Sequence, residues 1–315
     1  MLTQSRQYLD NTPMTFMSTK LPILILAYNR PDLAAQVMQV VQIYQPPRLY
    51  LACDGPRLHK QGDEERVGET RRTMESAVNW DCDLHTLFRE QNLGCAQGVY
   101  EAISWFFDQE EYGVIIEDDV VVSQDFFKLC EDLLPRYKND TKIMQISSLN
   151  TSGRVDIPNS YVYSQVFHCW GWASWRRAWQ QMDMQMNGIT KTTIPYLVKR
   201  IGLFRGRMMY YYFKQLYAHL EQSTSWATRW YHSILCSDGL VICPGVNLGI
   251  NIGLTQGEHY KHSDAHRPEA SLDLNRLSWP IKYDDSQIIN KRQKKYDTLF
   301  FAKTKWYGLL HKFSH

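Results

Sequence analysis

The fold is decided by the stretch Gly113-Val114-Ile115-Ile116-Glu117-Asp118-Asp119-Val120-Val121-Val122, in which three consecutive acids interrupt a run of β-branched residues. A strand of this composition is typically buried on both faces of a sheet, where an unpaired charge costs several kcal/mol. We therefore expect the strand to end at Glu117, so that Asp118 and Asp119 emerge at its carboxyl end, where open α/β sheets bind ligands. Two carboxylates there could hold a hard divalent cation together with water and substrate phosphate. A solvated turn after a strand is the alternative.

Short apolar runs and helical segments alternate before this stretch. In chain order we expect a strand at 22–28, a helix from Pro31, a strand at 48–53, a helix over 63–76, a strand at 84–88 and a helix from Gly94. This alternation indicates a mostly parallel sheet wrapped by helices, with right-handed crossovers. Asp54 directly follows the second strand, so a second acid is expected at a strand end.

The composition of the sequence changes at residue 150. Before that point we expect a helix from Gln124 to Leu134, ended by Pro135, and a strand over 142–148. Beyond it the chain is aromatic and loop-rich. The remaining expected elements are helical segments over 186–222, a helix over 223–235, a strand over 239–244 and a Gly- and Asn-rich stretch over 246–259.

Composition and charge limit the kind of protein this can be. The 315 residues are 44% apolar and 22% charged, as in globular proteins with a sizeable core. A net charge of +2 gives no overall electrostatic reason to bind nucleic acid. Seven cysteines without a CxxC pair fit a reducing compartment, and no apolar run has the length of a membrane span. We expect a cytoplasmic protein, with peripheral contact to the inner face of the cell membrane as an option.

The end of the chain is compositionally distinct. Residues 291–315 contain seven Lys or Arg and one Asp, interleaved with aromatic and aliphatic side chains. Such a pattern suits a helix lying on an anionic lipid surface, and a second basic and aromatic stretch, Lys199 to Lys214, could add to that surface. A C-terminal helix docked on the domain with a solvated basic face is the equal alternative.

Five blocks, taken together and in order, resemble GT-A glycosyltransferases that use nucleotide sugars. The resemblance is strongest to N-acetylglucosaminyltransferase I and to related bacterial enzymes that build surface polysaccharides. It covers roughly residues 21–260. The blocks are Leu24 to Pro31, Asp54-Gly55, Arg89 to Gly94, the acidic strand running into Asp125-Phe126-Phe127, and His168 to Trp179.

The resemblance implies an α/β fold of the GT-A, Rossmann-like kind. We expect a mostly parallel twisted sheet with flanking helices, an aromatic-rich acceptor half and a helical C-terminal extension. The expected division is an irregular lead-in over 1–20, a donor-binding half over 21–150, an acceptor-binding half of the same domain over 151–290 and a basic amphipathic tail over 291–315.

The resemblance also implies roles for the acids. The aspartate matching Asp54 would recognise uracil, whereas a turn residue before Gly55 is its plainer role. Asp119 would bind Mn²⁺ or Mg²⁺, Asp118 the ribose and Glu117 the sugar hydroxyls. A cation there would stabilise the negative charge that develops on the departing UDP phosphate.

Basic and amide side chains complete the expected donor site. Asn29 and Arg30, in the first block, are assigned to donor binding by the resemblance, and Arg89 is placed to help stabilise the phosphate charge. A surface ion pair with a neighbouring acid such as Glu90 is equally compatible with Arg89.

The tryptophans between residues 170 and 179 could contact the sugar or could pack in the core. Trp170-Gly171-Trp172 resembles the family's loop beside sugar and acceptor, where an indole can stack on a pyranose and Gly171 permits close approach. Trp175 and Trp179, at helical spacing, are expected in the core. His259, in a Gly-Glu-His segment, would reach the diphosphate or metal, although a lone histidine is commonly structural.

The expected general base is missing from its usual place. The family has an aspartate between two tryptophans, where this chain reads Trp226-Ala227-Thr228-Arg229-Trp230. An inverting displacement needs a base near the attacking hydroxyl. Glu221, Asp238 or Glu258 would have to substitute, and Glu221 is preferred because it precedes Trp226 on a helix expected to face the acceptor. A solvated helix acid is its alternative, and Arg229 could bind an anionic substrate.

The sequence therefore predicts a metal-dependent glycosyltransferase, with a UDP-sugar donor and a glycan or lipid-linked saccharide acceptor. A catalytically inactive nucleotide-sugar or glycan-binding module is the main rival. A sugar nucleotidyltransferase fits less well, because that class has a glycine-rich loop after the first strand and this chain has Tyr28-Asn29-Arg30-Pro31-Asp32 there.

Overall fold

The computed structural model describes residues 20–151, 159–254 and 271–312, with side chains to residue 303. The first half follows the expected alternation, and β1, β2, β3 and β4 run parallel to one another in the order β3-β2-β1-β4. Glu117 ends β4, as predicted. The elements are β1 (Ile23–Ala27), α1 (Pro31–Tyr44), β2 (Arg48–Cys53), α2 (Asp63–Ser76), β3 (Asp83–Phe88), α3 (Gly94–Gln109) and β4 (Tyr112–Glu117).

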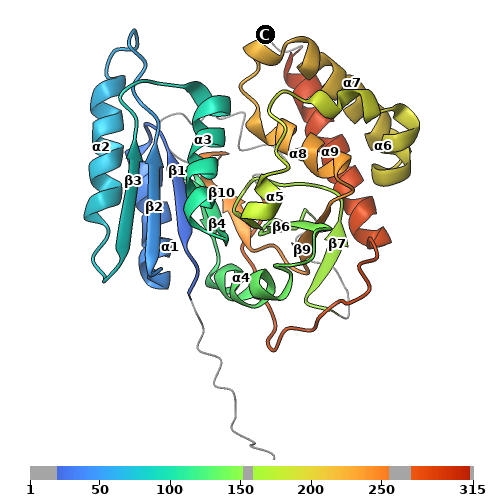
Figure 1. Ribbon diagram of the computed structural model, residues 1–315, viewed down its shortest axis with the longest axis horizontal. Helices are drawn as coiled ribbons and strands as arrows, with labels where there is room; N and C mark the ends of the chain where they lie inside the picture. The colour runs from blue at the N-terminus through green and yellow to red at the C-terminus, as the bar shows by residue number, and fades with distance from the viewer. Residues whose placement is uncertain (1–19, 152–158, 255–270, 313–315) are drawn as a thin grey trace, which may run out of the picture.

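The second half extends the same sheet and makes it mixed. Its strand order continues as β8-β6-β9-β7 beyond β4, and β8 runs antiparallel to both β4 and β6. The elements are α4 (Gln124–Arg136), β6 (Ile143–Ser147), β7 (Tyr161–Ser164), β8 (Trp172–Trp175), α5 (Arg176–Trp179), η1 (Asn187–Lys191), α6 (Ile194–Ile201), α7 (Leu203–Ala218), η2 (Leu220–Gln222), α8 (Trp226–Cys236) and β9 (Leu240–Pro244). The chain is thus α/β with helices flanking a mixed sheet in which parallel pairs predominate (Figure 1).

A second, two-stranded sheet lies directly after the acids. In it β5 (Val120–Val122) pairs antiparallel with β10 (Gly249–Asn251), which is followed by η3 (Ile252–Leu254). The N–H of Ile252 donates to the carbonyl of Asp119 at 2.8 Å. The acids therefore sit at the junction of the two sheets.

Several local expectations were wrong. Pro135 does not end α4, which continues to Arg136, because a proline in the last turn removes only its own N–H from the helix. Trp172 and Trp175 belong to a strand, so the helical spacing assumed for Trp175 does not hold. The strands β7, β8 and β10 were not predicted.

The aromatic residues of the second half form the core between the sheet and α8. Trp172 and Trp175 are fully buried, as is Trp230 of α8. The ring of Trp179, expected in the core and buried there, lies 5.1 Å from that of Trp230. This cluster joins α5 and α8 to the middle of the sheet.

The C-terminal α9 (Lys291–Lys312) docks on the domain. Its Asp297 is buried and accepts hydrogen bonds from Thr151 and Ser164. Gln293, one turn earlier, is also fully buried. Figure 1 shows α9 among α6, α7 and α8 at one end of the molecule. Over 291–303 α9 is therefore docked on the domain, and contact of the tail with lipid stays a prediction. None of the helices in the described ranges combines the length and apolarity that a membrane span requires.

Candidate active site

A cavity of about 660 Å³ opens at the carboxyl ends of β1, β2 and β4. Ligand sites of open α/β sheets are found at this edge, and the volume is that of an ordinary small-molecule pocket. Thr224, between η2 and α8, closes one side of it. The predicted site residues on its walls are Asn29, Arg30, Asp54, Arg89, Glu117 and Asp118.

Arg30 holds the two aspartates at the strand end. Its guanidinium pairs with Asp118, and its Nη1 lies 2.8 Å from Oδ2 of Asp119. The backbone N–H of Tyr28 donates to Asp118 at 3.1 Å. Both aspartates are buried, so this guanidinium compensates charges that would otherwise destabilise the fold.

Burial also shapes the protonation of the neighbouring acids. Burial, followed by the charges of Asp119 and Asp118, raises the pKa of Glu117 to about 8. Burial raises the pKa of Asp118 to about 6, and the charge of Arg30 opposes that shift. Glu117 faces the cavity, where a neutral carboxyl could both donate and accept hydrogen bonds with a hydroxylated ligand.

The surroundings of Asp119 fit an oxygen-bound cation. Oδ1 of Asp119 and Oδ1 of Asn251 are buried without hydrogen-bond partners. A Cβ on Gly253 would lie 2.8 Å from Oδ2 of Asp119 and 3.2 Å from Oδ1 of Asn251, so the glycine leaves a small space bordered by oxygen atoms. Carboxylate and amide oxygens are the donors that Mg²⁺ and Mn²⁺ accept. Within the described ranges, no three His, Cys, Asp or Glu side chains converge as a metal-binding set, so water and substrate oxygens would complete the shell.

Asp54 is occupied by backbone amides. Its carboxylate accepts from the N–H groups of Gly55, Leu93 and Gly94 at 2.9 to 3.1 Å. These bonds fasten the end of β2 to the first turn of α3. Because a carboxylate offers about four acceptor sites, Asp54 keeps limited capacity for a base N–H from a ligand.

A buried acid that sequence analysis missed organises the wall around Asn29. Asp63, the first residue of α2, is almost fully buried and accepts from Asn29 at 2.6 Å and from the hydroxyl of Tyr28. Although burial opposes it, hydrogen bonds from Arg57, Tyr28 and Asn29 hold the pKa of Asp63 well below its usual range. The sequence indicated only that a helix begins there.

Among the residues that the structure describes, four cationic side chains line the cavity. Arg57 and Lys60, both missed, join Arg30 and Arg89 on its walls. Arg89 forms an ion pair with Glu101 of α3, 2.8 Å between Nη2 and Oε2, instead of the adjacent acid. The lining thus combines cationic side chains with acids, as recognition of a diphosphate next to a sugar would require.

The tryptophan loop, assigned to the donor site by the resemblance, does not contribute to the walls described for this cavity. Trp172 is fully buried in β8, and its ring stacks on Trp226 with centroids 5.9 Å apart, so it is not on the cavity wall. Trp170 is partly exposed, and its carbonyl accepts from Ser148. Gly171 has φ of +69°, and a Cβ there would meet Val122 at 2.4 Å. The close approach expected of Gly171 is thus to β5.

The candidates for a general base separate by position. Glu221 lies in η2, not on α8 as expected, and lines a smaller cavity of about 390 Å³. This cavity shares Gly94, Cys95 and Thr224 with the larger one. Asp238 precedes β9, which runs parallel to β6 and hence to β4, so it lies at the opposite edge of the sheet. Glu258 and His259 lie outside the described residues.

Arg229 is used structurally. The side chain is buried, and its guanidinium donates to the carbonyls of Met184, Leu220 and Ser223 at 2.7 to 3.1 Å. It therefore fixes the turn that carries Glu221. Arg229 also lines the smaller cavity beside Glu221, and the anion-binding role considered for it stays a prediction.

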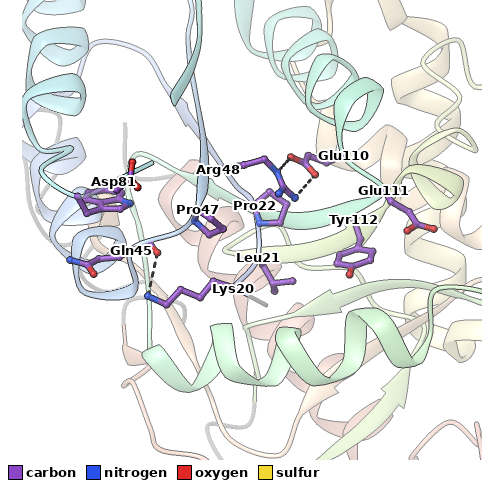
Figure 2. Close-up of a pocket in the computed structure, with 11 residues that line it drawn as sticks. Lys20, Leu21, Pro22, Gln45, Pro47, Arg48, Asp81, Glu110, Glu111 and Tyr112 are labelled. Atoms are coloured by element: carbon purple, nitrogen blue, oxygen red, sulfur yellow. Dashed lines mark hydrogen bonds and ion pairs between the residues drawn. The ribbon is translucent and has the colours of Figure 1, made fainter. Parts of the chain in front are cut away.

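A further cavity of about 770 Å³ lies at the amino ends of the strands (Figure 2). Its buried acid, Glu110, accepts from Arg48 at 2.9 Å and from the hydroxyl of Tyr50 at 2.8 Å. Lys20 donates to the carbonyl of Gln45. The buried acid of this cavity thus has partners, whereas the carboxyl edge includes unpartnered buried oxygens.

Comparison with known proteins gives one distant relative. No family model matches the chain. The alpha-1,3-mannosyl-glycoprotein 2-beta-N-acetylglucosaminyltransferase of Arabidopsis thaliana is 23% identical over 174 residues, which are 51% of this chain and 38% of that protein. This likeness supports a relationship to glycosyltransferases. The chain spans about two fifths of the length of the curated relative that it matches.

Solved structures add little. HddC from Yersinia pseudotuberculosis, alone and complexed with GMP-PN, matches with a TM-score of 0.32 at 11% and 10% identity, over 50% of this chain and 77% of that one. A TM-score this low does not establish a shared fold.

Proposed function

We propose that the protein is a metal-dependent glycosyltransferase of the GT-A kind. It transfers a sugar, such as N-acetylglucosamine, from a UDP donor to a glycan or lipid-linked saccharide in surface polysaccharide synthesis, with inversion at the anomeric carbon. The observation that carries the proposal is the carboxyl-edge cavity, where Glu117 and Asp118 face the cations Arg30 and Arg89. The likeness to a plant N-acetylglucosaminyltransferase supports the same reaction class.

The residues divide the work between donor and acceptor. Asp54 and the amide-linked end of β2 receive the base, and Glu117 binds sugar hydroxyls. Arg30 and Arg89 face the diphosphate and stabilise the charge of the departing nucleotide. Asp119 and Asn251 would hold Mn²⁺ or Mg²⁺, which supplies Lewis-acid stabilisation of the leaving group. Glu221, on the turn fixed by Arg229, takes the acceptor proton.

Binding of UDP tests the cation assignment. Asp119→Asn should weaken UDP binding in the presence of Mn²⁺ by about tenfold or more, because it removes the charged oxygen ligand. Binding without metal should change little. Titration calorimetry with and without Mn²⁺ measures both, and Asp132→Asn, at a half-buried acid that accepts from the hydroxyl of Tyr283, is the matched control. Equal Mn²⁺ dependence in Asp119→Asn and the parent protein would contradict the assignment.

Release of UDP from a panel of UDP-sugars tests the transferase itself, because hydrolysis of donor can occur slowly without acceptor. A nucleotide-sugar-binding module is the second candidate. It is favoured by Ala227 and Thr228 standing where the family has its carboxylate, and by the position of Asp238 at the far edge. Binding of UDP-sugar with no release of UDP, with or without saccharide acceptors, would select the module.

A further inference from the structure

One face of α7 gathers large apolar side chains at the surface. Leu203 is 66% exposed, Phe204 50%, Met208 38% and Tyr211 61%. Residues 204, 208 and 211 recur at spacings of four and three, which places them in one row along the helix. A well-packed helix usually turns such residues inward.

The same face is cationic. The segment from Met184 to Leu220 contains six Lys or Arg and no Asp or Glu. Of these, Arg207 and Lys214 are exposed, and their spacing from Tyr211 puts them beside the apolar row. We call the side chains of Leu203, Phe204, Arg207, Met208, Tyr211 and Lys214 the outer face of α7.

The rest of α7 is firmly packed, so the outer face is preformed. Met209 and Phe213 are buried, and a Cβ on Gly206 would lie 2.6 Å from the backbone N of Val198 in α6. On the side of α9, Arg205 is buried and donates to the carbonyl of Asp297 at 3.1 Å. The helix therefore presents its outer face without needing to rearrange.

We propose that the outer face of α7 docks on an anionic lipid bilayer. Its apolar side chains would enter the headgroup boundary while Arg207 and Lys214 meet anionic headgroups. A second copy of the chain is a poor occupant, because a two-fold contact would bring like charges together. The apolar side chains of Leu203 and Met208 cannot form hydrogen bonds or ion pairs with a phosphate backbone. This favours lipid over nucleic acid as the occupant.

Docking through α7 differs from docking through the tail. The polar side chains of the first turns of α9 that anchor it, Gln293 and Asp297, are buried against the domain. By contrast, α7 leads through η2 directly to Thr224 on the cavity wall. The carboxyl end of α7 is therefore close in the chain to the cavity wall.

Co-sedimentation of the full chain with vesicles tests the proposal. We expect binding to vesicles containing about one third phosphatidylserine at low salt, with little binding to pure phosphatidylcholine. Arg207→Gln with Lys214→Gln should lower the partition coefficient about 25-fold, because each cation contributes a factor of about five. Phe204→Ser with Tyr211→Ser should also lower it, including at salt concentrations that screen charge.

Matched controls carry the same chemical changes elsewhere. Arg72→Gln with Lys128→Gln removes two exposed cations on α2 and α4, and Ile43→Ser removes an exposed apolar side chain on α1. Both should bind like the parent protein. Thermal melting confirms that every variant is folded, and Leu203→Ser with Met208→Ser replaces any aromatic variant that is not.

Three results would overturn the proposal. One is failure of the parent protein to bind anionic vesicles. Another is an equal loss in the control and α7 variants, which would indicate a general charge effect. The third is binding of a single-stranded oligonucleotide, sensitive to the α7 changes, in place of vesicle binding.

Discussion

The carboxylate of Asp54 stabilises the fold and is also proposed to bind the base, and substitutions can separate these two roles. Asp54→Ala removes the acceptor for the amides of Gly55, Leu93 and Gly94, so we expect the free energy of unfolding to fall by about 1–2 kcal/mol. Asp54→Asn keeps one acceptor oxygen and should cost less. Urea denaturation measures both. An alanine variant as stable as the parent would show that these hydrogen bonds contribute no net stability.

His232 predicts a pH dependence of stability. It is 1% exposed, bonded to Thr192 at 2.9 Å, and burial lowers its pKa to about 4, against the opposing charge of Asp183. Since the unfolded chain binds the proton first, stability should fall as pH drops from about 6.5 to about 4, by about 3 kcal/mol, and be fully present above 6.5.

His232→Gln keeps a neutral polar side chain and should remove that part of the dependence. Urea midpoints at pH 4.5 and pH 7 measure the difference, with His219→Gln, at an exposed position, as the control. If the two variants lose stability equally between these pH values, the burial of a neutral His232 is not the cause.

Sequence analysis could place acids that interrupt an apolar strand. Asp118 and Asp119 could be placed because charges cannot remain inside a β-branched strand. Asp63 and Asn251 could not, because an acid at a helix start and an asparagine in a short strand are locally unremarkable. Their importance comes from partners far away in the chain: Tyr28 for the one and the strand after Asp119 for the other.

At the scale of elements, the docking of α9 depends on one buried carboxylate. Asp297→Ala leaves Thr151, Ser164 and Gln293 without their acceptor, and we expect the free energy of unfolding to fall by about 2–4 kcal/mol. Asp285→Ala removes an exposed partner of Arg136 and should cost less than about 1 kcal/mol. Urea denaturation of both proteins measures the contrast, and equal stability would mean that α9 is held by other contacts.

The elements that could be predicted carry their pattern locally. The strands β1, β2 and β4 are short apolar runs, and the helices α1 and α3 have regular apolar faces. The strand β8 was missed because Trp172-Ala173-Ser174-Trp175 is buried on both faces in the middle of the sheet, so it shows no alternation. The spacing of Trp175 and Trp179 favoured a helix instead.

At the scale of the whole molecule, the sheet is built in two directions. The first four strands are parallel, which fixes the edge where Asp54 and Asp118 meet and allowed that edge to be predicted. The antiparallel insertion of β8 next to β4 joins the second half. That insertion depends on pairing between distant segments, which local composition does not encode.

The pairing of β5 with β10 also has a consequence for the order in which the site forms during synthesis. Asp119 leaves the ribosome long before Asn251 and Gly253, and at about 5–20 residues per second the delay is on the order of ten seconds. A nascent chain that has completed β1 to β4 therefore has its acids and Arg30 but lacks the oxygen-lined space beside Asp119. The space beside Asp119 can therefore form only after residues 249–253 have been made.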